Sequence, residues 1–250
     1  MKTLENKTAI ITGAGSGIGK ATAFLFAEEG AQVIVSDINE ESGNEVAEEI
    51  KSNGGKASFL KADTSSPEEN EALVKEAVEK YGNLHVAVNN AGIGGPLSPV
   101  ADYPIDGWQK VIDVNLSGVF YGMKYQIPAI LASGGGNIVN NASILGQAGT
   151  KSSPAYVAAK HGLVGLTKAA ALEYAGRNIR VNSVGPGYIK TPLVMNNLDK
   201  ETRDALTALH PVGRMGESEE VAELILWLAS SKASFVTGSY YAVDGGYLAQ

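Results

Sequence analysis

The feature that most constrains the fold is a glycine-rich turn near the N-terminus. It lies in segment 13–19, after the apolar run 8–11 and before 21–27, where apolar residues recur at helical spacing. A strand, a glycine-rich turn and a helix in this order open a dinucleotide-binding sheet. Bare backbone at Gly13 permits a tight turn, and bare backbone at Gly17 lets a pyrophosphate approach the helix N-terminus. The segment therefore predicts a nucleotide site.

The glycine spacing alone is a weak pattern that an ordinary loop can share. It reads Gly-x-x-x-Gly-x-Gly, because Ile18 occupies the place of the third glycine in G-x-G-x-x-G. The prediction is strengthened by Asp37, which ends the next apolar run, 32–36. A carboxylate about 20 residues after the turn is where a ribose-binding acid belongs.

Strand-like and helix-like segments alternate along the rest of the chain, which favours a parallel sheet covered by helices on both faces. We therefore expect a single α/β domain over residues 1–250, with a Rossmann-type doubly wound sheet of about seven strands. After the first two strands, the expected strands are 56–60, 84–88, 137–141, 179–184 and 240–243, and the expected later helices are 40–52, 67–81, 105–131, 154–174 and 218–228.

Polar residues follow several of these strands. Asp37 and Asp63 each come after one strand, and Asn89, Ala91 and Gly92 follow the fourth. The ligand crevice of an open parallel sheet lies at the carboxyl ends of its strands, so these residues are expected to converge with the glycine turn.

The alternation breaks between residues 188 and 216. This stretch is long and irregular and carries scattered apolar residues. Long loops in compact domains tend to be lids or binding loops, so we expect a substrate-binding lid at about 188–216. His210 lies in it and could contact substrate.

Composition narrows the function classes. The chain has 27 acidic and 20 basic residues, a formal charge of −7, which argues against a nucleic-acid partner. It has no cysteine, and its three histidines have no partners at metal-ligand spacing, so no metal is expected. No apolar run approaches the ~18 residues of a spanning helix, and the start lacks a signal-peptide core. We expect a cytoplasmic protein without a membrane partner.

Tyr156 and Lys160 are four residues apart and would share one face of the helix 154–174. A cation about 4 Å from a phenol, at an effective dielectric near 20, favours the phenolate by about 4 kcal/mol, or about three pKa units. Such a pair would be usable for proton transfer near neutral pH. The alternative is a surface tyrosine stacked along a lysine stem.

The ordered motifs of the whole chain resemble the short-chain dehydrogenase/reductase family. That resemblance implies that Tyr156 is the general acid/base and that Lys160 lowers its pKa and binds the nicotinamide ribose. It implies that Ser143 holds the substrate oxygen and that Asn115 supports a water-linked proton relay to Lys160. The alternatives are that Ser143 is an ordinary loop hydroxyl and that Asn115 marks a capped kink inside its helix. The motifs are segment 12–19, Asn89-Asn90-Ala91-Gly92, Asn115, Ser143, Tyr156-x-x-x-Lys160, Pro186-Gly187 and Val243-Asp244-Gly245-Gly246.

The resemblance also implies NAD as cofactor and a small secondary alcohol or ketone as substrate. Asp37 favours NAD over NADP, because it would repel a 2′-phosphate and neither Ser16 nor Ile38 offers a positive charge. The alternatives are a reductase of 3-oxoacyl thioesters and a sensor that binds NAD without catalysis. The expected cofactor contacts are Gly13, Ser16, Gly17, Ile18, Asp37, Asp63, Asn89, Ala91, Gly92, Tyr156, Lys160, Pro186, Gly187, Ile189 and Thr191.

A homotetramer is expected from two helices that are apolar on most sides. Residues 155–174 and the middle of 105–131, from Val111 to Met123, are each more apolar than one sheet contact requires. The C-terminal stretch 235–248 is a second apolar patch. Two self-complementary patches would generate a tetramer, whereas burial of both helices in a monomer core is the alternative.

Overall fold

The computed structural model describes residues 2–196 and 199–250 and contains a seven-stranded parallel sheet. The strand order is β3-β2-β1-β4-β5-β6-β7, the doubly wound order extended by one strand. The predicted α/β fold is thus confirmed. The strands are β1 (Thr8–Thr12), β2 (Gln32–Asp37), β3 (Lys56–Lys61), β4 (Val86–Asn89), β5 (Gly136–Asn141), β6 (Ile179–Pro186) and β7 (Tyr240–Val243).

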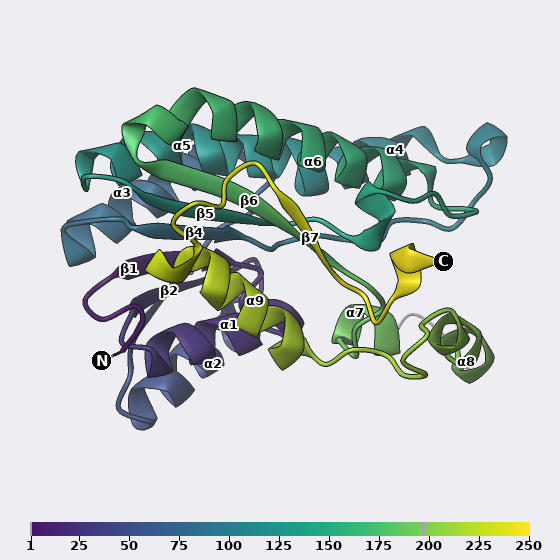
Figure 1. The fold of residues 1–250 in the computed structure, drawn as a ribbon, viewed down its shortest axis with the longest axis horizontal. Helices are drawn as coiled ribbons and strands as arrows, with labels where there is room; N and C mark the ends of the chain where they lie inside the picture. Colours follow the sequence, from purple (N-terminus) through teal and green to yellow (C-terminus); the bar gives the residue numbers. More distant parts are fainter. Residues whose placement is uncertain (1, 197–198) are drawn as a thin grey trace.

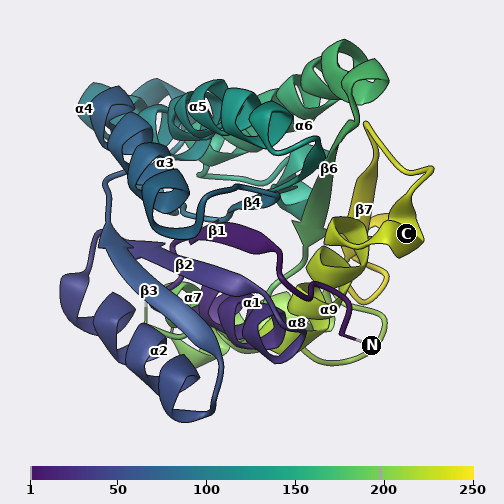
Figure 2. The same cartoon turned by 90° about the vertical axis from the view of Figure 1, so that its left-hand side faces the viewer.

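Helices cover both faces of the sheet, as Figures 1 and 2 show. One layer contains α3 (Pro67–Tyr81), α4 (Ile105–Ile112), α5 (Gly118–Ala132) and α6 (Pro154–Tyr174). The opposite layer contains α1 (Gly17–Glu28), α2 (Glu40–Ser52) and α9 (Ser218–Ala229). Two apolar clusters fill the space between the sheet and its two layers, so the sheet is buried on both faces.

Local sequence signals set several of these boundaries. The Ser66 hydroxyl accepts a hydrogen bond from the Glu69 N–H, and Pro67 begins α3. The Asn39 side chain caps α2 in the same way, through the Ser42 N–H. In the buried central strand β1, Ile10 and Ile11 are apolar on opposite faces of the sheet, as expected for a strand covered on both sides.

The segment predicted as one helix over 105–131 is interrupted. Between α4 and α5, residues Asp113–Ser117 form a π-helical turn that contains Asn115. π-turns inside helices are rare and occur frequently at functional sites. The chain is helical over the predicted range, but the sequence did not indicate the π-turn at the position of a candidate catalytic residue.

The irregular segment 188–216 contains two short helices, α7 (Pro192–Met195) and α8 (Lys200–Ala208). Residues 197 and 198 of this expected lid lie outside the described residues. Gly216 closes the base of the segment, since its N–H donates to the Tyr188 carbonyl at 3.0 Å and its carbonyl accepts from the Lys190 N–H at 2.9 Å. Figure 1 shows α7 and α8 beyond the carboxyl ends of β6 and β7, near the C-terminus.

Within the described ranges, none of the helices combines the length and the apolar character that crossing a bilayer demands.

Candidate active site

A cleft of about 1450 Å³ opens at the carboxyl ends of the strands, the place predicted for a ligand. It is large enough to hold a dinucleotide together with a small substrate, since single small-molecule pockets span roughly 300–1,000 Å³. All the predicted site residues except Asn89 and Asn115 line it: Gly13, Ser16, Gly17, Ile18, Asp37, Asp63, Ala91, Gly92, Ser143, Tyr156, Lys160, Pro186, Gly187, Ile189 and Thr191.

The glycine turn has the shape that a pyrophosphate needs. Gly13 and Gly17 have φ angles of 62° and 52°, a region that side chains rarely adopt. A Cβ on Gly17 would also lie 3.0 Å from the Thr191 side chain across the cleft. No side chain caps the N-terminus of α1 at Ser16, and its first turn has no acidic residue. The free N–H groups and positive end of the dipole thus face the cleft, which fits an anionic group.

Asp37 is held at the rim of this turn. Its Oδ2 accepts a hydrogen bond from the Gly15 N–H at 2.9 Å, and its Oδ1 accepts one from the Asn39 N–H at 2.9 Å. The carboxylate is therefore fixed beside the helix that would hold the pyrophosphate. This is the placement expected of a ribose ligand.

Asn89 does not face the cleft, contrary to the prediction. Its side chain is buried on the other side, where it donates to Gln126 and Asn140 at 3.2 and 2.9 Å. Adjacent residues at a strand end point in opposite directions, so the next residue, Asn90, lines the cleft instead.

Asn90 belongs to one of the motifs named above but was not among the expected cofactor contacts, although it lines the cleft. Its Nδ2 donates to the carbonyl oxygens of Thr12 and Gly13, at 2.9 and 3.1 Å. The Thr12 hydroxyl in turn accepts from the N–H groups of Asn90 and Ala91. These bonds join the end of β4 to the glycine turn. The doubled asparagine marks this position in the sequence, but which of the two residues faces the cleft depends on where β4 ends.

Ser143 and Tyr156 meet in the cleft. Ser143 follows β5, and its Oγ accepts the Leu145 N–H at 3.1 Å, which leaves its hydroxyl proton available to a second oxygen. Burial raises the pKa of the Tyr156 phenol, the hydrogen bond with Ser143 lowers it, and the Tyr188 phenol raises it further. Burial is the largest of these effects, so the pKa of the Tyr156 phenol lies above its ordinary value, and the hydrogen bond with Ser143 offsets part of the rise.

Lys160 is buried beside them, with only 4% of its surface exposed. Its Nζ donates to the Asn141 carbonyl at 2.7 Å and lies 5.5 Å from the centre of the Tyr156 ring. The carbonyl thus holds the ammonium in place over the face of the phenol ring. Burial lowers the pKa of Lys160 to about 8, so it remains mostly charged at neutral pH.

Asn115 lies behind the cleft wall. Its amide oxygen accepts the Ile93 N–H and its amide nitrogen donates to the Ile93 carbonyl, both at 2.8 Å. A Cβ on Gly92 would lie 3.1 Å from the Asn115 oxygen and 3.8 Å from the Lys160 ammonium. Asn115 therefore fixes the backbone next to Lys160 without itself lining the cleft.

Apolar side chains from three parts of the chain also line the cleft. They come from the loop after β4, from the turn after Ser143 and from the segment 188–216: Ile93, Leu97, Ile144, Leu145, Val194 and Leu206. Such a lining suits a small apolar substrate held by few polar contacts.

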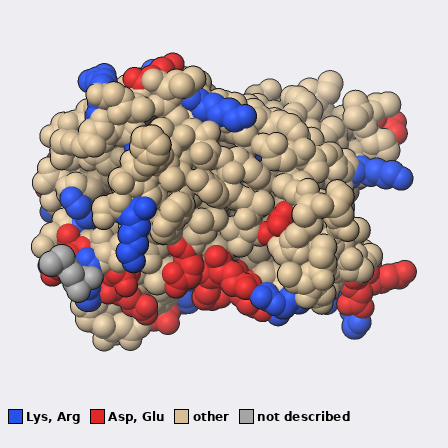
Figure 3. Space-filling model, viewed as in Figure 1, with Lys and Arg blue, Asp and Glu red and all other residues tan. Residues whose placement is uncertain are grey.

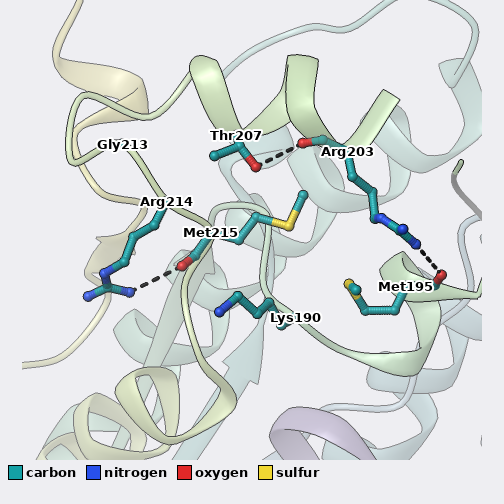
Figure 4. Close-up of a pocket in the computed structure, with 7 residues that line it drawn as sticks. All are labelled: Lys190, Met195, Arg203, Thr207, Gly213, Arg214 and Met215. Carbon is teal, nitrogen blue, oxygen red and sulfur yellow. Dashed lines mark hydrogen bonds between the residues drawn. The ribbon is translucent and has the colours of Figure 1, made fainter. Parts of the chain in front are cut away.

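A second, smaller pocket of about 200 Å³ lies at the irregular segment (Figure 4). Its cationic residues do not converge on a common point, and Arg203 donates to the Met195 carbonyl at 2.9 Å. Lys190 and Arg214 pair with Glu217 and Glu220. These ion pairs connect the two ends of the segment 188–216 to α9.

No cluster of three metal-binding side chains occurs in the part of the chain that the structure describes.

Comparison with known proteins gives matches over nearly the whole chain. A family model described as enoyl-(acyl carrier protein) reductase matches residues 13–248. Cyclohexanol dehydrogenase of Acinetobacter sp. (strain SE19) is 56% identical over 243 residues, 97% of this chain and 95% of that protein. The cis-4-hydroxycyclohexanecarboxylate dehydrogenase of Sinomonas cyclohexanicum is 44% identical over 97% of each chain. Carveol dehydrogenase from Mycobacterium avium, solved in complex with NAD, has a TM-score of 0.94 at 29% identity and full coverage of both chains.

Proposed function

The chain belongs to the short-chain dehydrogenase/reductase family, and from that premise we propose that it is an NAD-dependent dehydrogenase of cyclic secondary alcohols. The reaction is reversible, so the same site reduces the corresponding ketones. The observation that carries the proposal is one cleft in which Ser143, Tyr156 and Lys160 lie together with the glycine turn and Asp37. The ring-bearing substrates named for two relatives support the substrate class.

The residues of the cleft fit NAD. The α1 N-terminus with Gly13, Ser16, Gly17 and Ile18 would hold the pyrophosphate, and Asp37 would accept hydrogen bonds from the adenosine ribose. A fixed carboxylate at this place disfavours the 2′-phosphate of NADP. The other predicted contacts, except Asn89, also line the cleft and would be within reach of the bound cofactor.

NAD, when bound, supplies the acceptor for the hydride that leaves the carbinol carbon. The protein supplies the path of the proton. Tyr156 in its phenolate form accepts the hydroxyl proton of the alcohol, and Ser143 donates a hydrogen bond to the same oxygen. In the reverse direction, the Tyr156 phenol returns the proton to the ketone oxygen.

The charge on Lys160 favours the phenolate that this role requires. At an effective dielectric near 20, a unit charge 5.5 Å from the Tyr156 ring favours the anion by about 3 kcal/mol, or about two pKa units. This opposes the effect of burial, which raises the pKa of the phenol. Asn115 supports Lys160 through the backbone of the Gly92–Ile93 segment.

A reductase of 3-oxoacyl thioesters is the second candidate, and a relative named 3-oxoacyl-[acyl-carrier-protein] reductase, 43% identical over 243 residues, favours it. The two candidates differ in substrate and cofactor. We expect oxidation of cyclohexanol with NAD to exceed that with NADP by at least about tenfold in kcat/KM, as a difference of 1.4 kcal/mol gives. Reduction of acetoacetyl-coenzyme A with NADPH at a higher kcat/KM than cyclohexanone with NADH would overturn the proposal.

We also propose that the enzyme is a homotetramer and that the segment 188–216 closes over the substrate as a lid. Exposed apolar side chains support the assembly, including Phe120 on α5, Leu172 on α6 and Phe235. In the view of Figure 3, acidic side chains gather in the lower part of the molecule, around α9, and few charged side chains lie over α6 and β7. Such faces are suited to contact between copies of the chain.

A further inference from the structure

His210 is a buried side chain to which the reaction scheme gives no role. It follows α8 and is 3% exposed. It does not line the cleft, so direct contact with substrate, which its place in the sequence suggested, is not what the structure shows. Instead, it lies between Tyr188, which does line the cleft, and Tyr247 near the C-terminus.

Two hydrogen bonds fix the state of the imidazole. Nδ1 lies 2.9 Å from the Leu206 carbonyl oxygen, and the Tyr188 N–H donates to Nε2 at 3.1 Å. A carbonyl oxygen only accepts, so Nδ1 carries the proton; a backbone N–H only donates, so Nε2 is bare. In this arrangement Nδ1 donates and Nε2 accepts, and His210 joins the end of α8 to the backbone that follows β6.

Packing tightens this connection. A Cβ on Gly187 would lie 2.7 Å from His210 Nε2 and 3.1 Å from the Asp244 Cα, so the imidazole sits directly on the glycine backbone. The His210 ring meets the Tyr188 ring edge-on, with centroids 5.8 Å apart, and the Tyr247 ring at 5.7 Å. The backbone at 187–188 is thus held from two sides.

The segment that His210 holds forms part of the cleft wall beside Tyr156. Tyr188 lines the cleft and is close enough to Tyr156 for the two phenols to interact electrostatically. The next residues toward the cofactor are anchored separately, because Ile189 pairs with Gly216 in an isolated bridge. Loss of the His210 contact would therefore disturb Tyr188 more than the cofactor-facing residues.

We infer that His210 is a positioning residue for substrate: by accepting the Tyr188 N–H, it fixes the Tyr188 ring as a wall of the substrate end of the cleft. It touches neither substrate nor cofactor. The inference rests on the proposed role of Tyr156, which makes this end of the cleft the substrate end.

Two substitutions separate the bonds of the imidazole. His210→Gln can place an amide oxygen near the Nε2 position and so keep an acceptor for the Tyr188 N–H. His210→Asn can keep a donor toward the Leu206 carbonyl but leaves the Tyr188 N–H without its partner. The measurements are KM and kcat for cyclohexanol at saturating NAD, the Kd of NADH by fluorescence titration, and Tm.

We expect His210→Asn to raise the KM for alcohol about tenfold, the effect of a lost contact worth about 1.4 kcal/mol. The Kd of NADH should change by less than about twofold, and kcat should change by a smaller factor than KM. His210→Gln should keep KM within about threefold of the wild type. KM does not depend on the fraction of active protein, so partial unfolding would not mimic this pattern.

His85→Asn is the matched control. The ring nitrogen of His85 also accepts a backbone N–H, that of Thr8, but at the opposite end of the sheet. The variant His85→Asn should leave the KM for alcohol unchanged. An unchanged KM in His210→Asn, or equal increases in the Asn and Gln variants, would overturn the inference. The test uses whichever secondary alcohol the wild type oxidises, so a wrong substrate class in the proposed function would appear separately, as no turnover of cyclohexanol by the wild type.

Discussion

Replacing Lys160 by methionine should stabilise the protein while removing activity. Lys160 is buried, and among the described residues no carboxylate pairs with its ammonium. Burial lowers its pKa from 10.5 to about 8, a difference of about 2.5 units. At 1.36 kcal/mol per unit, the charged state costs about 3 kcal/mol at neutral pH. Methionine has a similar length and removes that cost, but it forfeits the bond to the Asn141 carbonyl, worth about 1 kcal/mol.

The pH dependence of this difference is the sharper test. The folded pKa of Lys160 lies below the unfolded one, so between about pH 8 and 10.5 only the unfolded chain retains the proton. The free energy of unfolding of the wild type therefore rises between about pH 8 and 10.5 because of Lys160. Below about pH 8, the cost of burying the charged ammonium does not change with pH. Lys160→Met lacks this contribution. The free energy of unfolding of Lys160→Met should exceed that of the wild type most at pH 7. This difference should shrink by about 2–3 kcal/mol toward pH 10.5.

The measurement is urea unfolding of both proteins at several pH values and one protein concentration, since assembly makes stability depend on concentration. Lys168→Met, on the exposed side of the same helix, is the control and should show little change with pH. A difference between Lys160→Met and the wild type that stays constant from pH 7 to 10.5 would refute the reasoning. That result would mean that the buried ammonium is solvated or paired in solution.

The remaining predictions concern the site and the assembly. Tyr156→Phe should lower kcat at least about a thousandfold, within the range of general acid/base effects, with the Kd of NADH nearly unchanged; a tenth of wild-type activity would exclude Tyr156 as acid/base. Asn115→Ala should free the Ile93 backbone and reduce kcat without abolishing NADH binding, as stopped-flow and fluorescence titration would show. Light scattering at micromolar concentration should give four times the 26.0 kDa chain mass, whereas a monomer would exclude the tetramer. Cofactor should slow limited proteolysis within 188–216; equal cleavage rates with and without NADH would count against a lid.

Much of the fold was accessible from local sequence. The strand, glycine turn and helix at the N-terminus form where expected, because apolar periodicity and the turn residues act over a few positions. Asp37 and Asp63 reach the cleft for the same reason, since each ends or follows a parallel strand. The alternation of these segments was sufficient to predict the doubly wound sheet, while the roles of the cleft residues stay predictions.

Tertiary structure decided what the side chains of the site contact. Sequence alone could not choose between Asn89 and Asn90, because which of them faces the cleft depends on where β4 ends. The π-helical turn at Asn115 accompanies bonds to Ile93, 22 residues earlier in the chain. The ammonium of Lys160 is held by the carbonyl of Asn141, a residue at the end of β5 and 19 positions away in the sequence.

The His210–Tyr188 bond is the clearest case. The two residues are separated by 22 positions within a segment that shows no helical or strand periodicity as a whole. Gly187 reads as part of a short motif, yet the structure shows that its missing side chain makes room for an imidazole and for the Asp244 backbone. Periodicity and turn chemistry are local properties of a chain, so they determined the elements and their order. Contacts between distant residues depend on how those elements pack, and only the folded structure determined them.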